Sequence, residues 1–365
     1  MKKMLSILST LTLVSSTVTS VVACGDKKDV IYLILPENPN TQWQNFIDTA
    51  TNYLKKDDTL NSKYKVRWAS SEQRADKELE NTRAAVDGGA KAIIIGQNNQ
   101  NEREAAKYVN ENNVPLIGVN IPFSADAADN EKPNFQVIQE YDKGSKTLGD
   151  EVVKVLKAGK PDKEKYGLYE MWGTPEMNGV PERHNGFKNA GNWDWIGTSD
   201  LPAGFNGEGM VGNWVDNMAY EKTKTQLGSG DALSKVDVVY AHNDGMARAA
   251  RQAIEDVPGG REALTTTFND KGEIEKLGIL VVGYDYDSIS QQMIADWGKN
   301  ADKDSTYKNL FATMEMSATE MAEKAMAKAV QEIENQNANK GKMTVEPLTI
   351  ALHMADHKFA TKDEE

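Results

Sequence analysis

Amide and carboxylate side chains directly follow apolar segments of strand length at several points in the chain. The clearest case is the segment from 238 to 255, VVYAHNDGMARAARQAIE, in which His242, Asn243 and Asp244 stand between a strand-like run and a helical pattern. Asp285 ends a second apolar run, VVGYD, and Asn120 ends a third, LIGVN. Amides and carboxylates each make several directional hydrogen bonds, which is what the hydroxyls of a polyol require.

Aromatic side chains accompany these strand ends, as Trp43 and Trp172 do. Aromatic rings cover the weakly apolar C–H faces of a sugar. Elsewhere, Arg183 lies in the polar segment GTPEMNGVPERHNGF (173–187), Trp214 follows a glycine-rich stretch, and Trp43 opens an amphipathic helical pattern at 41–56. Polar groups that are buried by the ligand give specificity, because an unpaired group is costly. These residue types favour a monosaccharide ligand.

Several of these residues also have a purely structural interpretation. Asn243 and Asp244 are typical helix caps, and both roles are compatible if Asp244 caps while Asn243 faces a ligand. Trp43, taken alone, is typical of the core side of an amphipathic helix. Arg183 is adjacent to Glu182, and a surface ion pair between them would contribute little to stability. The joint placement at strand ends is what favours the binding interpretation.

The elements that position these residues follow a regular rhythm. Apolar runs of strand length alternate with amphipathic helical segments from 30 to 120, and the alternation begins again from 144 to 285. This pattern predicts an α/β protein with two doubly wound parallel-sheet lobes. In such sheets, ligands bind beyond the carboxyl ends of the strands. A polar insertion at 257–276 interrupts the second half, and 344–354 is expected to add one more strand.

The predicted lobes are discontinuous in sequence. We expect an N-terminal lobe formed by 30–139 with 315–343, and a C-terminal lobe formed by 140–314 with 344–365, joined by three crossovers. A hinge of this kind allows the lobes to close on a ligand.

The first residues are typical of a targeting segment. Lys2 and Lys3 precede a short apolar run that ends in small residues, which favours a secretory signal over residues 1–23. Cys24 is the only cysteine, so it has no intramolecular partner. VVAC resembles the lipobox of bacterial lipoproteins, which implies cleavage before Cys24, a lipid on its sulfur, and a tether at 24–29; the alternative is an ordinary signal with a chance cysteine.

Other classes of function find little support. A net charge of −13 disfavours a nucleic-acid partner. The chain has neither a phosphate-binding glycine motif nor a G-x-S-x-G nucleophile elbow, and its four histidines lack metal-ligand spacing. A retaining glycosidase needs carboxylates on both sides of a bond, whereas Asp285 and Asp287 share one loop. We therefore expect a binding protein without a catalytic residue, metal or cofactor.

The motifs resemble the bacterial galactose/glucose-binding protein family, the substrate-capturing subunits of sugar ABC importers. The resemblance runs from about Ile31 to about Met354. AHNDGMARAARQAIE is similar to the family's N-N-D-A-M-A segment, VVGYD to its V-x-G-x-D strand end, NVPLIGVN to N-V-P-V-V-x-x-N, and 173–187 to its G-E-P segment. The resemblance implies that sugar hydroxyls bind Asn120, Arg183, Asn243 and Asp285, with Trp43 and Trp214 on the two faces of the ring.

The chain departs from the family pattern at several contacts. Met177 and Gly179 replace a histidine and an aspartate of the G-E-P segment, with Asn178 or Glu176 as substitutes. The family has a ligand-binding aspartate before its first aromatic residue. This chain has none in the loop before Trp43, so Asn40, Thr41 or Gln42 would take its place. The last crossing carries Met314 and Glu315 where the family has asparagine, and the family's calcium loop lacks its spaced carboxylates here, so we expect no calcium at that position.

These features lead to one functional hypothesis and its alternatives. The hypothesis is a monomeric, lipid-anchored protein on the extracellular face of the cell membrane, which delivers galactose or glucose to an ABC transporter permease. The alternatives within the same fold are xylose, ribose or a nucleoside, whose base would stack between Trp43 and Trp214. A transcriptional repressor of this fold would carry an N-terminal helix-turn-helix, where this chain has its signal-like segment.

Overall fold

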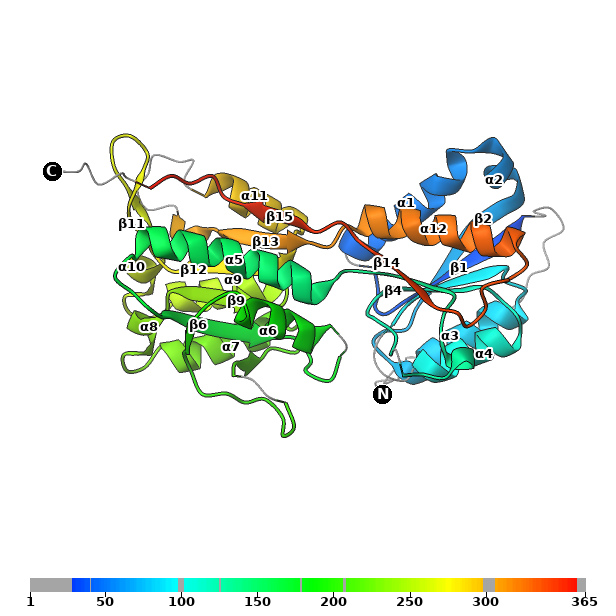
Figure 1. Ribbon diagram of the computed structural model, residues 1–365, viewed down its shortest axis with the longest axis horizontal. Helices are drawn as coiled ribbons and strands as arrows, with labels where there is room; N and C mark the ends of the chain where they lie inside the picture. Colours follow the sequence, from blue (N-terminus) through cyan, green and yellow to red (C-terminus); the bar gives the residue numbers. More distant parts are fainter. Residues whose placement is uncertain are drawn as a thin grey trace, which may run out of the picture.

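The computed structural model describes residues 28–39, 41–97, 102–124, 126–177, 179–205, 208–297 and 306–359. These residues form two lobes side by side, each an open sheet with helices packed on both faces (Figure 1). The α/β class and the two-lobe arrangement predicted from the sequence are confirmed.

The N-terminal lobe holds a six-stranded, fully parallel sheet in the order β14-β5-β4-β3-β1-β2. Its strands are β1 (Asp29–Leu35), β2 (Tyr64–Ser70), β3 (Ala92–Gly96), β4 (Leu116–Asn120), β5 (Phe135–Ile138) and β14 (Thr344–Pro347). Its helices are α1 (Thr41–Lys55), α2 (Asp58–Lys63), α3 (Ala75–Asp87), α4 (Glu102–Glu111), the 3-10 turn η1 (Asp129–Glu131) and α12 (Ala318–Glu334).

The C-terminal lobe holds the second sheet, in the order β15-β13-β12-β9-β6-β7, with β8 also paired to β6. Its strands are β6 (Tyr166–Trp172), β7 (Trp193–Trp195), β8 (Met210–Val211), β9 (Val238–Ala241), β12 (Leu280–Asp285), β13 (Ala312–Glu315) and the antiparallel edge strand β15 (Ala351–Met354). Its helices are α5 (Tyr141–Gly159), α6 (Val180–Lys188), α7 (Asp216–Leu227), α8 (Ala232–Lys235), α9 (Asp244–Glu255), α10 (Gly260–Leu264), α11 (Ser288–Asp296) and the 3-10 turn η2 (Thr306–Lys308).

The predicted polar insertion at 257–276 forms its own small elements. It contains α10 and an antiparallel hairpin of β10 (Thr267–Phe268) and β11 (Ile274–Lys276). The hairpin turn is closed by the Asn269 side chain, whose Oδ1 accepts hydrogen bonds from the backbone N–H groups of Lys271 and Glu273, both at 2.9 Å.

The central strands are apolar throughout because helices cover both of their faces. All five residues of β3, AIIIG, and all four of β9, VVYA, are buried. Helix α12 packs on this core through a stripe of small and flexible side chains, which is buried on the side that faces β3, β4 and β5. These rigid strands fix the positions of the loops at their carboxyl ends.

The chain crosses between the lobes three times, and the third crossing differs from the prediction. The first two crossings lie between β5 and α5 and between β13 and α12. The segment 344–354 is two strands rather than one: β14 pairs with β5 in the first sheet, and only β15 joins the second. The last backbone hydrogen bond to β5 is donated by Leu348 to the carbonyl of Ile138 at 2.8 Å, so the crossing follows Leu348 instead of preceding Thr344.

No helix in the described part of the chain combines the length and apolar character that crossing a bilayer requires. The predicted signal (1–23) and tether (24–29) lie outside the described residues, except for 28 and 29, and so does Cys24.

Candidate ligand-binding site

The carboxyl ends of one strand from each sheet meet at the hydroxyl of Tyr141. Tyr141 begins α5 in the C-terminal lobe, and its Oη donates a hydrogen bond of 2.6 Å to the backbone carbonyl of Asn120 at the end of β4. The same hydroxyl lies 3.7 Å from the sulfur of Met316, the residue that follows β13. Two of the strand ends predicted to form the site, those of β4 and β13, are therefore brought together at this junction.

Arg183 lies in the first turn of α6 and is buried, with 6% of its surface exposed. Its guanidinium carbon lies 4.3 Å from the ring centroid of Tyr141, 4.6 Å from that of Tyr284 and 5.1 Å from that of Trp214. Cation–π attraction therefore holds the arginine in place.

The surface ion pair between Arg183 and Glu182 is not formed. The carboxylate of Glu182 accepts a hydrogen bond from the backbone N–H of Gly179 at the start of the helix. The buried Nε of Arg183 has no hydrogen-bond partner among the described residues. A buried donor of this kind remains available to a ligand.

The Trp214 ring lies flat against the backbone of Gly173, just after β6. A Cβ atom added to Gly173 would approach the indole to 2.1 Å, so only glycine permits this contact. The indole Nε1 donates to the sulfur of Met177 at 3.1 Å, and the ring is partly exposed. Trp214 therefore offers an aromatic surface beside Arg183.

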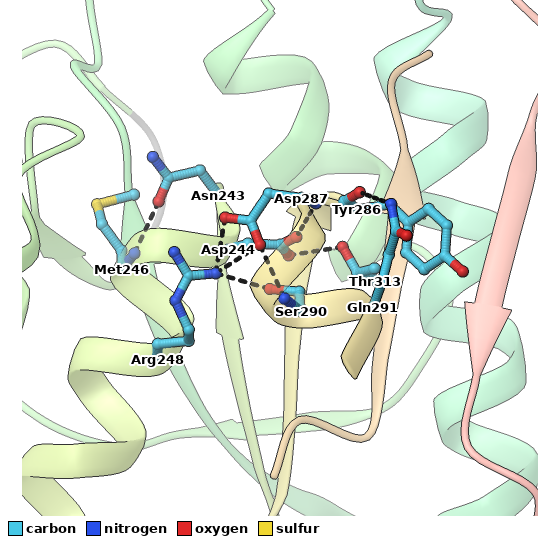
Figure 2. Close-up of polar contacts among 9 residues, drawn as sticks. All are labelled: Asn243, Asp244, Met246, Arg248, Tyr286, Asp287, Ser290, Gln291 and Thr313. Atoms are coloured by element: carbon cyan, nitrogen blue, oxygen red, sulfur yellow. Dashed lines mark hydrogen bonds and ion pairs between the residues drawn. The ribbon is translucent and has the colours of Figure 1, made fainter. Parts of the chain in front are cut away.

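The helix-capping role expected of Asp244 belongs to Asn243 instead. Asn243 caps α9, with its Oδ1 accepting from the backbone N–H of Met246 at 2.8 Å (Figure 2). Asp244 points inward and is fully buried, where it accepts from the Thr313 hydroxyl at 2.6 Å and from the backbone N–H of Asp287 at 3.0 Å. Asp244 therefore ties α9 to β13 and to the loop that follows β12.

The close approach of Asp244 to the sheet depends on another glycine. Its Oδ1 lies 2.2 Å from where a Cβ of Gly283 would stand in β12. Burial raises the pKa of Asp244 to about 7. Burial also raises the pKa of Asp285 well above its ordinary value, and the negative charge of Asp244 adds to this effect. Each of the two carboxyls therefore keeps its proton to a higher pH than an exposed aspartate does.

Asp287, in the loop after Asp285, makes two further contacts that hold this loop in place. Asp287 caps α11 by accepting from the backbone N–H of Ser290 at 2.8 Å, and it forms an ion pair of 2.7 Å with Arg248 (Figure 2). Asp285 itself is partly buried and has a φ of 118°, a conformation that L-residues rarely adopt.

Left-handed backbone conformations recur at this face of the molecule. Besides Asp285, the non-glycine residues with positive φ include Asn120 (70°), Trp214 (64°) and Tyr286 (60°). Such conformations cost free energy and persist where the surrounding structure imposes them, commonly at ligand sites. This observation is independent of the residue types and supports the same location.

Glu315 at the end of β13 contacts a neighbouring strand. Its Oε2 lies 2.7 Å from Nε2 of His353 in β15, and the His353 ring stacks on Tyr286 at 3.5 Å between ring centroids. A cavity of about 330 Å³ opens beside this stack between α11 and β15, and its lining includes Trp297 and Leu352. Glu315 is adjacent to Asp285 across the β12–β13 pair, so it borders the candidate site.

Trp43, in the first turn of α1, is buried and does not face the candidate site. Only 2% of Trp43 is exposed, because its ring packs edge-on against Phe46 and against Gly96. This burial does not support the expectation that Trp43 covers one face of a sugar. Its contacts are those of a core residue on an amphipathic helix. Thr41 begins α1, but its side chain lies outside the described set, as do Asn40 and Asn178 entirely.

Sequence reasoning missed the two tyrosines that contact Arg183. Tyr141 stands at the first crossover, and Tyr284 directly precedes Asp285. The available signals were an aromatic residue at the start of the helical pattern after β5 and another beside the strand-end Asp285. No group of three or more metal-ligating side chains suited to an ion was found in the described ranges.

Comparisons with known proteins agree with this architecture. The family described as "Periplasmic binding protein domain" matches residues 31–337. No curated protein sequence matches the chain.

Similar solved structures include a galactofuranose binding protein, at 17% identity over 89% of this chain and 94% of that one, with a TM-score of 0.66. A periplasmic solute binding protein of an ABC transporter from Actinobacillus succinogenes, with bound D-allose, is 16% identical over 89% and 97%, with a TM-score of 0.67. One from Bacillus halodurans, with bound myo-inositol, is 15% identical over 91% and 96%, with a TM-score of 0.65. At these identities the likeness establishes the fold.

Proposed function

We propose, from the premise that this chain belongs to the periplasmic binding protein domain family, that it captures a monosaccharide between its lobes and delivers it to an ABC importer. Galactose and glucose are the first candidates. The observation that carries the proposal is the meeting of strand ends from both sheets at Tyr141, with Arg183 and Asp285 on the same face.

The chemistry of the gathered groups suits a polyol. Arg183 is a buried donor, the Asp285 carboxyl accepts and, when it holds a proton, also donates, and Asn120 offers an amide. A sugar hydroxyl likewise donates and accepts, so it satisfies groups of both kinds. The indole of Trp214 provides one apolar surface for the C–H face of the ring.

The ligands of the similar structures share this chemistry. Galactofuranose, D-allose and myo-inositol, named for those proteins, all present hydroxyls around a small ring. A nucleoside would stack its base between two aromatic side chains. Trp43 is buried in the core, so only Trp214 remains of the pair expected for either ligand. The sugar is favoured instead by the polar groups Asn120, Arg183 and Asp285, which suit hydroxyls.

Capture would proceed by lobe closure and not by chemistry. The three crossovers act as the hinge, and the closed form would dock on the permease. Lipid attachment at Cys24 and residence on the extracellular face complete the proposal. Mass spectrometry of the mature N-terminus tests the anchor: a diacylglyceryl group on Cys24 is expected, and an unmodified thiol would contradict it.

Isothermal calorimetry tests the binding proposal. The wild-type protein is titrated with glucose, galactose, xylose, ribose and adenosine, and we expect one hexose to bind most tightly. Asp285→Ala should abolish binding of that hexose while leaving the circular dichroism spectrum unchanged. Normal binding by the variant, or preference for adenosine, would contradict the assignment.

A further inference from the structure

A buried carboxylate joined to two imidazoles lies directly behind the candidate site. Glu170 in β6 is 1% exposed; its Oε2 lies 2.8 Å from Nδ1 of His184, and its Oε1 lies 2.9 Å from Nε2 of His242. The Trp172 ring contacts both imidazoles, with ring centroids 4.6 and 5.4 Å apart. None of these residues has a place in the binding chemistry described above.

The hydrogen bonds around His242 determine its tautomer. The backbone N–H of Gly173 donates to Nδ1 of His242 at 3.4 Å, so this nitrogen carries no proton. The proton is therefore on Nε2, which donates to Glu170. Burial lowers the pKa of His242 to about 4, so its ring is neutral at physiological pH.

His184 is less constrained than His242. Its Nδ1 donates to the Glu170 carboxylate, whereas its buried Nε2 has no partner among the described residues. Burial alone would raise the pKa of Glu170, but the two histidines outweigh it and lower the pKa. Glu170 is therefore an ionised acceptor of two imidazole donors.

The chain neighbours of these residues carry the candidate ligand contacts. His184 follows Arg183 on α6, His242 precedes Asn243 at the end of β9, and Gly173 supports the Trp214 ring. One carboxylate thus connects three segments that lead to the site. We propose that Glu170 is a positioning residue, which holds Arg183, Asn243 and Trp214 in binding geometry; this inference rests on the proposed function.

Two substitutions of Glu170 separate hydrogen bonding from shape. In Glu170→Met both imidazole donors lose their acceptor, and we expect sugar affinity to fall at least about tenfold. In Glu170→Gln the amide oxygen can face His242, and the amide N–H then faces Nδ1 of His184. His184 can accept this bond by moving its proton to Nε2, so affinity should stay within about threefold of wild type.

Asp237 provides a matched control. It is a buried carboxylate of the same lobe, 1% exposed, and accepts from Lys160, Lys163 and the backbone N–H of Gly167, at the opposite end of β9. Asp237→Asn should lower the melting temperature but keep sugar affinity within about twofold, because no candidate ligand residue depends on it.

The experiment combines calorimetry with ¹⁵N NMR of the histidine rings. Affinities for the hexose preferred by wild type are measured at a temperature where every variant is folded by circular dichroism. We expect Nε2–H for His242 and Nδ1–H for His184 in wild type, and a switch of His184 to Nε2–H in Glu170→Gln.

The proposal is overturned if Glu170→Met binds the sugar like wild type, if Asp237→Asn weakens binding as much as Glu170→Met, or if His242 carries its proton on Nδ1. A wild-type protein that binds none of the sugars would instead refute the proposed function. The two failures are therefore distinguishable.

Discussion

The Tyr141 hydroxyl and the Asn120 carbonyl form a 2.6 Å hydrogen bond between the two lobes. The ring of the same tyrosine contacts the Arg183 guanidinium at 4.3 Å. One side chain therefore touches a candidate ligand residue in each lobe. This contact gives Tyr141 two separable functions, one for its hydroxyl and one for its ring.

Tyr141→Phe removes the hydroxyl and keeps the ring, so we expect a loss of about 1 kcal/mol in unfolding free energy and a few-fold weaker sugar binding. Tyr141→Leu also removes the aromatic face under Arg183 and should weaken binding by about tenfold. Calorimetry and urea denaturation measure both effects. Equal affinities for the two variants would show that the ring does not support Arg183.

Trp214 should report ligand binding by fluorescence, and Trp43 should not. Trp214 is partly exposed beside Arg183, whereas Trp43 is closed into the core. The chain has seven tryptophans, so single Trp→Phe variants are compared. We expect the sugar-induced intensity change to disappear in Trp214→Phe and to persist in Trp43→Phe. If the intensity change instead disappeared in Trp43→Phe and persisted in Trp214→Phe, Trp43 would be the residue that contacts the sugar.

The stability of the protein should depend on pH through Asp244. Its pKa is about 7 in the folded state, against an ordinary value of 3.8, so the folded state retains a proton that the unfolded chain has already lost. The contribution of Asp244 to stability therefore falls as pH rises from 4 to 7. Relative to Asp244→Asn, the loss should be on the order of 3 kcal/mol.

Asp244→Asn is a suitable reference because its amide can satisfy both neighbours. The oxygen accepts from the Asp287 N–H, and the nitrogen donates to the Thr313 hydroxyl. Asp237→Asn is a control with the opposite pH dependence. The pKa of Asp237 is lowered in the folded state, so the stabilisation by its carboxylate is lost as pH falls and not as pH rises. A wild-type to Asp244→Asn difference that stays constant from pH 4 to 7 would contradict the protonation of Asp244.

The fold was predictable because its signals are local and repeated. The all-buried runs that became β3 and β9 and the helical stripes between them specify a parallel sheet wherever they occur. The division of 344–354 between two sheets was missed. Apolar content does not reveal which sheet edge a strand will join.

The site was predictable only in part, because strand-end residues were chosen by type. Arg183 and Asp285 lie on the expected face, but side-chain direction depends on tertiary contacts. Asn243 and not Asp244 caps α9, and Asp244 turns inward because Gly283 leaves room for its carboxylate. The Glu170 network joins residues up to 72 positions apart, and no local pattern encodes it.

Small-angle X-ray scattering tests the central claim, capture of a monosaccharide by closure of the lobes, most directly. Scattering of the wild type and of Asp285→Ala is recorded with and without a saturating amount of the hexose that calorimetry identifies. The radius of gyration should decrease with sugar in the wild type and remain unchanged in the variant. Identical wild-type profiles with and without bound sugar would contradict the claim.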